Sequence, residues 1–139
     1  MLEISKELLT QIDNHGKQTY PDESCGIMVG FLEGDKRIIK KVYPAENLNK
    51  ERSKDRYELS QKDFLNADRD AAKNDMDIVG IYHSHPDHPS KASETDREKA
   101  HQGYSYLITA IHQGEFFSRN SWVLDENNQF QEEEINQLP

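Results

Sequence analysis

Asp77-Ile-Val-Gly-Ile-Tyr-His-Ser-His-Pro86 is the stretch with the clearest structural signal in the chain. Its first six residues form a short apolar run that is typical of a buried strand. Side chains two residues apart on a strand point to the same face, so His83 and His85 present their imidazoles together and Ser84 points away. Pro86 has no amide donor and ends the strand. The stretch therefore predicts two neighbouring imidazoles at a strand end.

A turn and a short helix are predicted to follow this strand. Asp87-His-Pro-Ser90 has the composition of a turn. Ser93-Glu-Thr-Asp-Arg-Glu-Lys-Ala100 predicts a helix with Asp96 in its first turn. Two imidazoles and one carboxylate make a set of three ligands, and zinc with three protein ligands keeps its fourth position for water.

A simpler interpretation exists for each half of this pattern. A His-x-His pair can be two solvent-exposed side chains at a strand end. Ser93 and Asp96 resemble a helix capping box in which Asp replaces Glu or Gln, and an Asp there also favours the positive end of the helix. Each interpretation explains one half, and neither explains why both halves follow the same strand.

The complete pattern resembles a known signature. His-x-His-Pro, six residues, Ser, two residues and Asp is similar to the motif of the Jab/MPN (JAMM) metallopeptidases. In that family a glutamate upstream completes the site, and the motif-like segment Pro21–Gly30 places it at Glu23. The resemblance includes Tyr43–Asn47 and Arg56–Leu59 and extends over most of the chain. Without large insertions, the chain looks like the small stand-alone prokaryotic members.

This resemblance implies an α/β fold with a mixed, largely antiparallel β-sheet flanked by helices, as in Jab/MPN and cytidine-deaminase-like proteins. It implies one zinc ion per chain, with His83, His85 and Asp96 as the metal ligands. It also implies a zinc metallopeptidase that hydrolyses peptide or isopeptide bonds after the C-terminal Gly-Gly of ubiquitin-like or sulfur-carrier proteins. The tail of such a protein is then the expected partner.

The chemistry assigns a role to each remaining candidate. Zinc lowers the pKa of bound water from about 15.7 toward about 7. Glu23 is the expected catalytic base that takes the water's proton and passes it to the leaving amine, a contribution of about 10²–10⁴-fold. Ser93 is the expected catalytic donor to the oxyanion. Cys25 on an apolar run indicates a small buried residue, and His88 beside a proline indicates an exposed one.

Two other functions match part of the pattern. A non-catalytic MPN-type interaction module would bind a partner without chemistry, but such modules typically lack a ligand or the glutamate, and none is missing here. A zinc deaminase would need His-x-Glu followed by Pro-Cys-x-x-Cys. The single cysteine of this chain excludes that arrangement.

The composition bounds the class of protein. The 139 residues predict a single domain over residues 1–139, and 31% charged against 34% hydrophobic residues predicts a polar surface over a small core. A net charge of -9 argues against a nucleic-acid partner. No apolar run approaches the roughly 20 residues of a membrane helix, and Met1–Tyr20 lacks the apolar region of a signal peptide. We therefore expect a cytoplasmic protein without membrane contact.

The rest of the pattern predicts alternating helices and hairpins. Glu132–Glu134 is expected to be an exposed edge or tail. Helices are expected from Leu2 past Ile12 to near Gly16 and from Ser60 to about Asn74. Strands are expected at Cys25–Leu32, Lys36–Tyr43, Tyr57–Leu59, Tyr104–His112, Glu115–Leu124 and Phe130–Ile135, with a loop at Pro44–Arg56.

Overall fold

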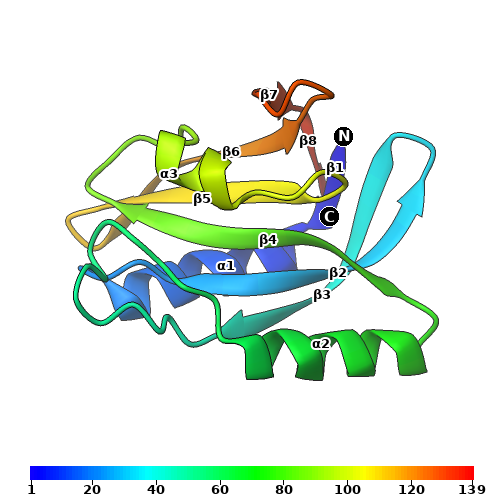
Figure 1. Cartoon of the computed structure of the whole chain (residues 1–139), viewed down its shortest axis with the longest axis horizontal. Coiled ribbons are helices and arrows are strands. Elements are labelled where there is room, and N and C mark those ends of the chain that lie inside the picture. Colours follow the sequence, from blue (N-terminus) through cyan, green and yellow to red (C-terminus); the bar gives the residue numbers. More distant parts are fainter.

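Eight strands form one mixed sheet in the computed structural model, which describes residues 1–139 (Figure 1). The strand order is β7-β6-β5-β4-β2-β3-β1-β8, with four antiparallel and three parallel pairings. The predicted α/β class with a largely antiparallel sheet is confirmed. The elements are β1 (Leu2–Ser5), α1 (Lys6–Thr19), β2 (Cys25–Glu33), β3 (Lys36–Ala45), α2 (Gln61–Lys73), β4 (Asp77–Pro86), α3 (Glu94–Lys99), β5 (Ser105–His112), β6 (Glu115–Leu124), β7 (Phe130–Glu133) and β8 (Ile135–Leu138).

Strand β4 lies in the middle of the sheet and separates two apolar clusters. One cluster joins Tyr82 to Leu9 and Ile12 of α1. The other joins Ile81 to Ala67 and Ala71 of α2. The two helices lie against different sides of the sheet (Figure 1). Because both sides are covered, β4 is an uninterrupted buried strand, as its apolar run predicts.

The first helix begins later than its apolar stripe predicts. Leu2 and Ile4 are fully buried, but they belong to β1, which pairs in parallel with β3 and β8. The helix begins at Lys6, where the side chain of Ser5 accepts a hydrogen bond from the Leu8 amide at 3.2 Å. Two apolar residues that lie two positions apart are compatible with a strand as well as with a helix. Here the pairing with distant strands decides in favour of the strand.

The C-terminal segment connects the two edges of the sheet. Strands β7 and β8 are consecutive along the chain but lie at opposite edges of the sheet, so the sheet must curl. The Leu2 amide donates to the Glu134 carbonyl at 2.9 Å, and the N-terminal amine lies 3.1 Å from the Glu133 carboxylate. The expectation of one strand over Phe130–Ile135 was therefore wrong. Glu132 and Glu134 are exposed as expected, but the Glu133 side chain on this edge strand is only 6% exposed.

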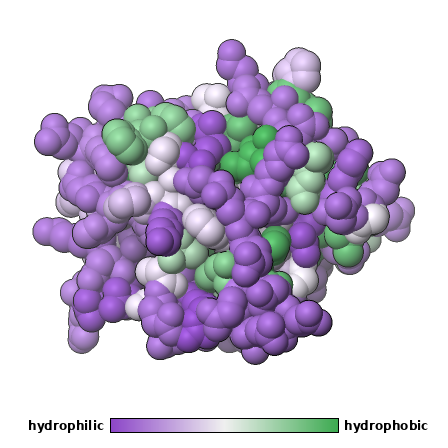
Figure 2. Space-filling model, turned by 90° about the horizontal axis from the view of Figure 1, so that it is seen from above, coloured by the Kyte–Doolittle hydropathy of each residue, from purple (hydrophilic) through white to green (hydrophobic).

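The surface is polar, as the composition predicts. Figure 2 shows a largely hydrophilic face on which hydrophobic residues form separate small patches. None of the three helices combines the length and the apolar composition that crossing a membrane requires.

Candidate metal centre

The C-terminal end of β4 and the first turn of α3 bring three ligand-type side chains together. His83 is fully buried and His85 is 7% exposed, and their Nε2 atoms lie 3.2 Å apart. Asp96 reaches both rings, with Oδ1 at 3.2 Å from His83 Nε2 and Oδ2 at 3.1 Å from His85 Nε2. One ligand atom from each residue lies within 4.8 Å of the others.

The two rings are held by different means. His85 Nδ1 lies 2.8 Å from the Pro89 carbonyl and donates to it, which leaves Nε2 as the ring nitrogen that faces Asp96. His83 Nδ1 is buried without a partner. The His83 ring is instead stacked on Tyr57, with the ring centroids 4.6 Å apart and the planes inclined by 27°. Both Nε2 atoms are thereby aimed at one point.

The charges around this point favour an ionised carboxylate. Burial alone would raise the pKa of Asp96, but His83, His85 and the Ser93 amide hold it well below its ordinary value. Burial lowers the pKa of His85, yet its bonds with Asp96 and the Pro89 carbonyl outweigh burial and raise it. Burial lowers the pKa of His83. A buried anion therefore faces two imidazoles.

The donor set fits a divalent metal ion. Two imidazole nitrogens only 3.2 Å apart can share at most one proton between them. An ion that accepts both lone pairs and the carboxylate satisfies all three groups at once. Zinc is commonly bound by two imidazoles and a carboxylate, as in catalytic sites that keep one position open.

Glu23 lies immediately before β2, and its backbone is fixed on both sides. Its amide donates to the Ser53 carbonyl at 2.6 Å, and its carbonyl accepts from Asn47 Nδ2 at 3.3 Å. The side chain is 5% exposed, and Oε1 has no hydrogen-bond partner. Burial raises the pKa of Glu23 to about 8, although the nearby His85 lowers it. The carboxyl group is therefore able to exchange a proton near neutral pH.

Glu23, His85 and Ser93 line one cleft of about 460 Å³. Ser93 caps α3: its Oγ accepts from the Asp96 amide at 3.0 Å, and Asp96 Oδ2 accepts from the Ser93 amide at 2.9 Å. The capping box is therefore present. The Ser93 hydroxyl uses only its acceptor there, so its proton is free to be donated into the cleft.

The loop between the histidines and Asp96 is fixed by the neighbouring hairpin β5–β6. Its three consecutive carbonyls at positions 88, 89 and 90 each accept a side-chain donor: His112 Nε2 at 3.1 Å, His85 Nδ1 at 2.8 Å and Trp122 Nε1 at 3.1 Å, respectively. Sequence reasoning did not find His112 or Trp122, because they follow Asp96 by 16 and 26 residues and carry no local signal.

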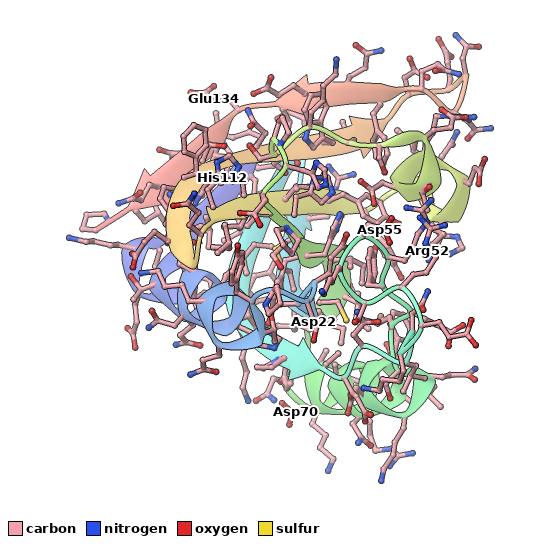
Figure 3. The ribbon with its side chains drawn as sticks, turned by 90° about the vertical axis from the view of Figure 1, so that its left-hand side faces the viewer. Asp22, Arg52, Asp55, Asp70, His112 and Glu134 are labelled. Atoms are coloured by element: carbon pink, nitrogen blue, oxygen red, sulfur yellow. The ribbon has the colours of Figure 1, made fainter.

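A second loop, residues 46–58, forms another wall of the cleft. Figure 3 shows Arg52 and Asp55 side by side in this loop, with Asp22 on the segment that faces it. The Ser53 hydroxyl donates to Asp22 Oδ1 at 2.8 Å. This contact and the Glu23–Ser53 backbone bond fasten the loop beside Glu23.

The remaining candidates lie where the sequence suggests. Cys25 is buried, and burial raises the pKa of its thiol to about 12, which makes it unreactive. His88 is exposed at the rim of the cleft. Ser84 points to the other face of β4, where its Oγ accepts from the Ser24 amide at 2.8 Å.

Comparison with known proteins gives consistent matches. Residues 5–125 match the family model described as prokaryotic homologs of the JAB domain. A desampylase of Haloferax volcanii is 36% identical over 89 residues, which cover 63% of this chain and 62% of that protein. A CysO-cysteine peptidase of Mycobacterium tuberculosis is 32% identical over 108 residues, which cover 78% of this chain and 71% of that protein. The match to the desampylase thus spans less than two thirds of its length.

Solved structures share the fold. A Desulfitobacterium hafniense protein solved in solution has a TM-score of 0.87 at 28% identity, covering 99% of this chain and 93% of its own. A JAB1/MPN domain protein from Archaeoglobus fulgidus has a TM-score of 0.63 at 17% identity, covering 100% of this chain and 98% of its own. The second likeness supports the fold alone.

Proposed function

Because this chain belongs to the family of prokaryotic homologues of the JAB domain, we propose that it is a zinc-dependent peptidase. Its substrates are peptide or isopeptide bonds after the C-terminal Gly-Gly of ubiquitin-like or sulfur-carrier proteins. The observation that carries the proposal is the convergence of His83, His85 and Asp96 at one point beside a cleft. The relatives named desampylase and CysO-cysteine peptidase support the substrate class.

His83, His85 and Asp96 hold one zinc ion in this proposal. A bound zinc ion supplies Lewis acidity, which polarises the scissile carbonyl and acidifies water. His85 keeps its ring orientation through Nδ1 and the Pro89 carbonyl at 2.8 Å. His83 keeps its orientation through the stacked ring of Tyr57. The Pro89 contact fixes the tautomer of His85, and the stacked Tyr57 ring fixes only the direction of His83.

Glu23 moves the proton. Its Oε1 is buried without a protein partner, and Glu23 lines the same cleft as His85, so its carboxyl group can accept a proton from the attacking water and deliver it to the leaving amine. Burial raises the pKa of Glu23 to about 8, although a nearby zinc ion would lower it. A carboxyl group that exchanges its proton near the working pH is an efficient general acid and base.

Ser93 stabilises the oxyanion. Its Oγ is fixed by the Asp96 amide at 3.0 Å, and the free hydroxyl proton can be donated to the carbonyl oxygen as negative charge develops on it. A preorganised donor of this kind contributes on the order of 10²–10³-fold to turnover.

The test uses the whole chain and a carrier protein that ends in Gly-Gly and bears one additional residue. The chain is stripped of metal with a chelator and then supplied with zinc, and release of the residue is followed by mass spectrometry. We expect no cleavage without metal and restored cleavage with one zinc ion per chain. Equal cleavage by the metal-free chain would contradict the proposal, and binding of the carrier without any cleavage would instead favour a non-catalytic MPN-type module.

A further inference from the structure

The cleft beside Glu23 carries positive charge that the proposed reaction does not use. Its lining includes two permanent cations, Arg56 and Lys91, beside two acidic residues, Glu23 and Asp55. The chain as a whole has a net charge of -9. Arg52 binds both carboxylate oxygens of Asp55, so Arg56 and Lys91 are the charged groups of the lining that remain for an added anion.

Arg56 is placed on the same side of the cleft as Glu23. The side-chain amide of Asn47 donates to the Glu23 carbonyl at 3.3 Å and to the Arg56 carbonyl at 3.1 Å. One NH₂ group thus holds the two backbones together. Both side chains line the same cleft.

The guanidinium of Arg56 is only partly engaged. Its Nη1 donates to the Asp55 carbonyl at 2.9 Å and lies 3.6 Å from the Asp55 carboxylate. That carboxylate is itself bound by Arg52 through both of its oxygens. Nε and Nη2 of Arg56 form no hydrogen bond within the chain, and its side chain is 31% exposed. Arg56 therefore keeps two donors for an anion.

The position of Glu23 identifies which part of a substrate these donors meet. Glu23 protonates the leaving amine, so groups next to it face the leaving group. In a released amino acid the α-carboxylate is attached to the carbon that bears this amine. In a lysine isopeptide the amine ends a long side chain, and no carboxylate lies near it.

We propose that Arg56, with Lys91 adding to the positive field, binds the free α-carboxylate of the residue that is released. This inference rests on the proposed peptidase function and narrows it: the enzyme removes a single C-terminal residue from its carrier in preference to cleaving lysine isopeptides. A guanidinium suits this role because its planar donors match a carboxylate.

The test compares three substrates built on one carrier ending in Gly-Gly. The first bears one additional residue with a free carboxylate, the second bears the same residue as its carboxamide, and the third bears a peptide lysine joined through its side chain. A hydrogen bond to a charged group contributes about 10–100-fold. We expect the zinc-loaded wild type to favour the free acid over the amide by a kcat/KM ratio of that size.

Arg56→Gln gives the decisive comparison. It should reduce the acid-to-amide ratio toward unity, because it removes the carboxylate donors. Lys54→Gln is the matched control, since it removes one charge from the same loop at a residue outside the lining of this cleft, and it should keep the wild-type ratio. A structural role for Arg56 would lower kcat/KM for both substrates equally, and that result would overturn the inference.

Two outcomes with the wild type separate this inference from the function on which it rests. Equal cleavage of acid and amide, or faster cleavage of the lysine conjugate than of the acid, would overturn the carboxylate site and leave the peptidase intact. Cleavage of none of the three substrates would remove the proposed function itself, and the inference with it.

Discussion

The two faces of β4 differ in how well their polar groups are satisfied. On the face toward α1, the Tyr82 hydroxyl lies 2.7 Å from His15 Nδ1, and Ser84 Oγ accepts from the Ser24 amide at 2.8 Å. On the face toward α2, two imidazoles stand 3.2 Å apart and His83 Nδ1 has no partner. We call these the anchored face and the ligand face.

The difference indicates what each face is for. A buried polar group without a partner costs about 1–3 kcal/mol, and the ligand face, with the adjacent Glu23, carries such groups. The anchored face is packed and hydrogen-bonded, so it holds the strand in place while the other face keeps lone pairs free. Buried atoms without a partner also occur away from β4, at Asp13, Thr109 and Arg119, so what distinguishes the ligand face is that its unpaired groups lie beside converging ligand atoms. Poor local pairing in an otherwise consistent fold is typical of functional sites.

The largest effect should follow the loss of a ligand. His83→Ala removes one of three converging groups, so we expect the variant to bind no zinc and to retain no hydrolysis above background. Elemental analysis and the carrier assay measure these two properties. A fully zinc-loaded His83→Ala variant would exclude His83 from the ligand set.

Tyr82→Phe is the matched change on the anchored face. It removes the hydroxyl that meets His15 Nδ1, and should keep zinc and activity. Its stability should fall by only about 1 kcal/mol.

A smaller effect is expected for the metal-free Glu23→Gln variant, whose stability should rise relative to wild type. Burial raises the pKa of Glu23 from 4.5 to about 8 in the folded chain. Between these pH values the unfolded chain loses the proton and the folded chain keeps it, so wild-type stability falls as the pH rises. Glutamine does not titrate. The free energy of unfolding of the variant should therefore rise relative to that of wild type across this window. The rise should be a few kcal/mol, on the order of 1.4 kcal/mol per pKa unit.

Urea unfolding of the chelated proteins at several pH values measures this gain. The other titrating groups near the site are the same in both chains, so the difference between the two isolates Glu23. A constant difference from pH 4.5 to 8 would contradict a raised pKa of the buried carboxyl group.

Gly26→Ala should damage the anchored face. Gly26 pairs with Tyr82 across β2 and β4, and an added Cβ would lie 2.1 Å from the tyrosine ring. Moving that ring in a packed core costs about 1–3 kcal/mol. Thermal unfolding should show the loss, with zinc stoichiometry unchanged. Lost zinc binding at unchanged stability would mean that the two faces are not separable.

Trp122→Phe should have a smaller effect on zinc binding than the loss of a ligand, and it acts through the loop. The substitution keeps an aromatic ring but removes the donor to the Ser90 carbonyl, next to the Pro89 carbonyl that orients His85. Loss of such a supporting contact weakens metal binding by about 10-fold or more. Zinc titration measures it, and Phe116→Leu on the same strand, at an exposed residue, is the control. Equal zinc affinity in Trp122→Phe and wild type would exclude this role.

The sequence predicted the parts of the molecule that depend on short spacing. Strand geometry alone places His83 and His85 on one face and Ser84 on the other. One helical turn separates Ser93 from Asp96, so the directions of all these side chains follow from local rules. The family suggested by these motifs is confirmed by the match over residues 5–125. The roles of the site residues stay predictions.

What the sequence did not predict depends on contacts between distant segments. Leu2–Ser5 and Ile135–Leu138 become neighbouring strands only because the sheet curls and brings the chain ends together. Tyr57 and Trp122 support the ligands from separate elements, at positions that no local pattern connects to the histidines. Propensity and periodicity carry no information about such pairings.

The central claim is that three groups hold zinc and that Glu23, outside this set, moves the proton. Zinc-loaded Glu23→Gln tests it most directly, in a single preparation that is measured for metal content and for turnover of the carrier conjugate. We predict one zinc ion per chain and a loss of turnover of about 10²–10⁴-fold. Wild-type turnover by the zinc-loaded variant would contradict the account.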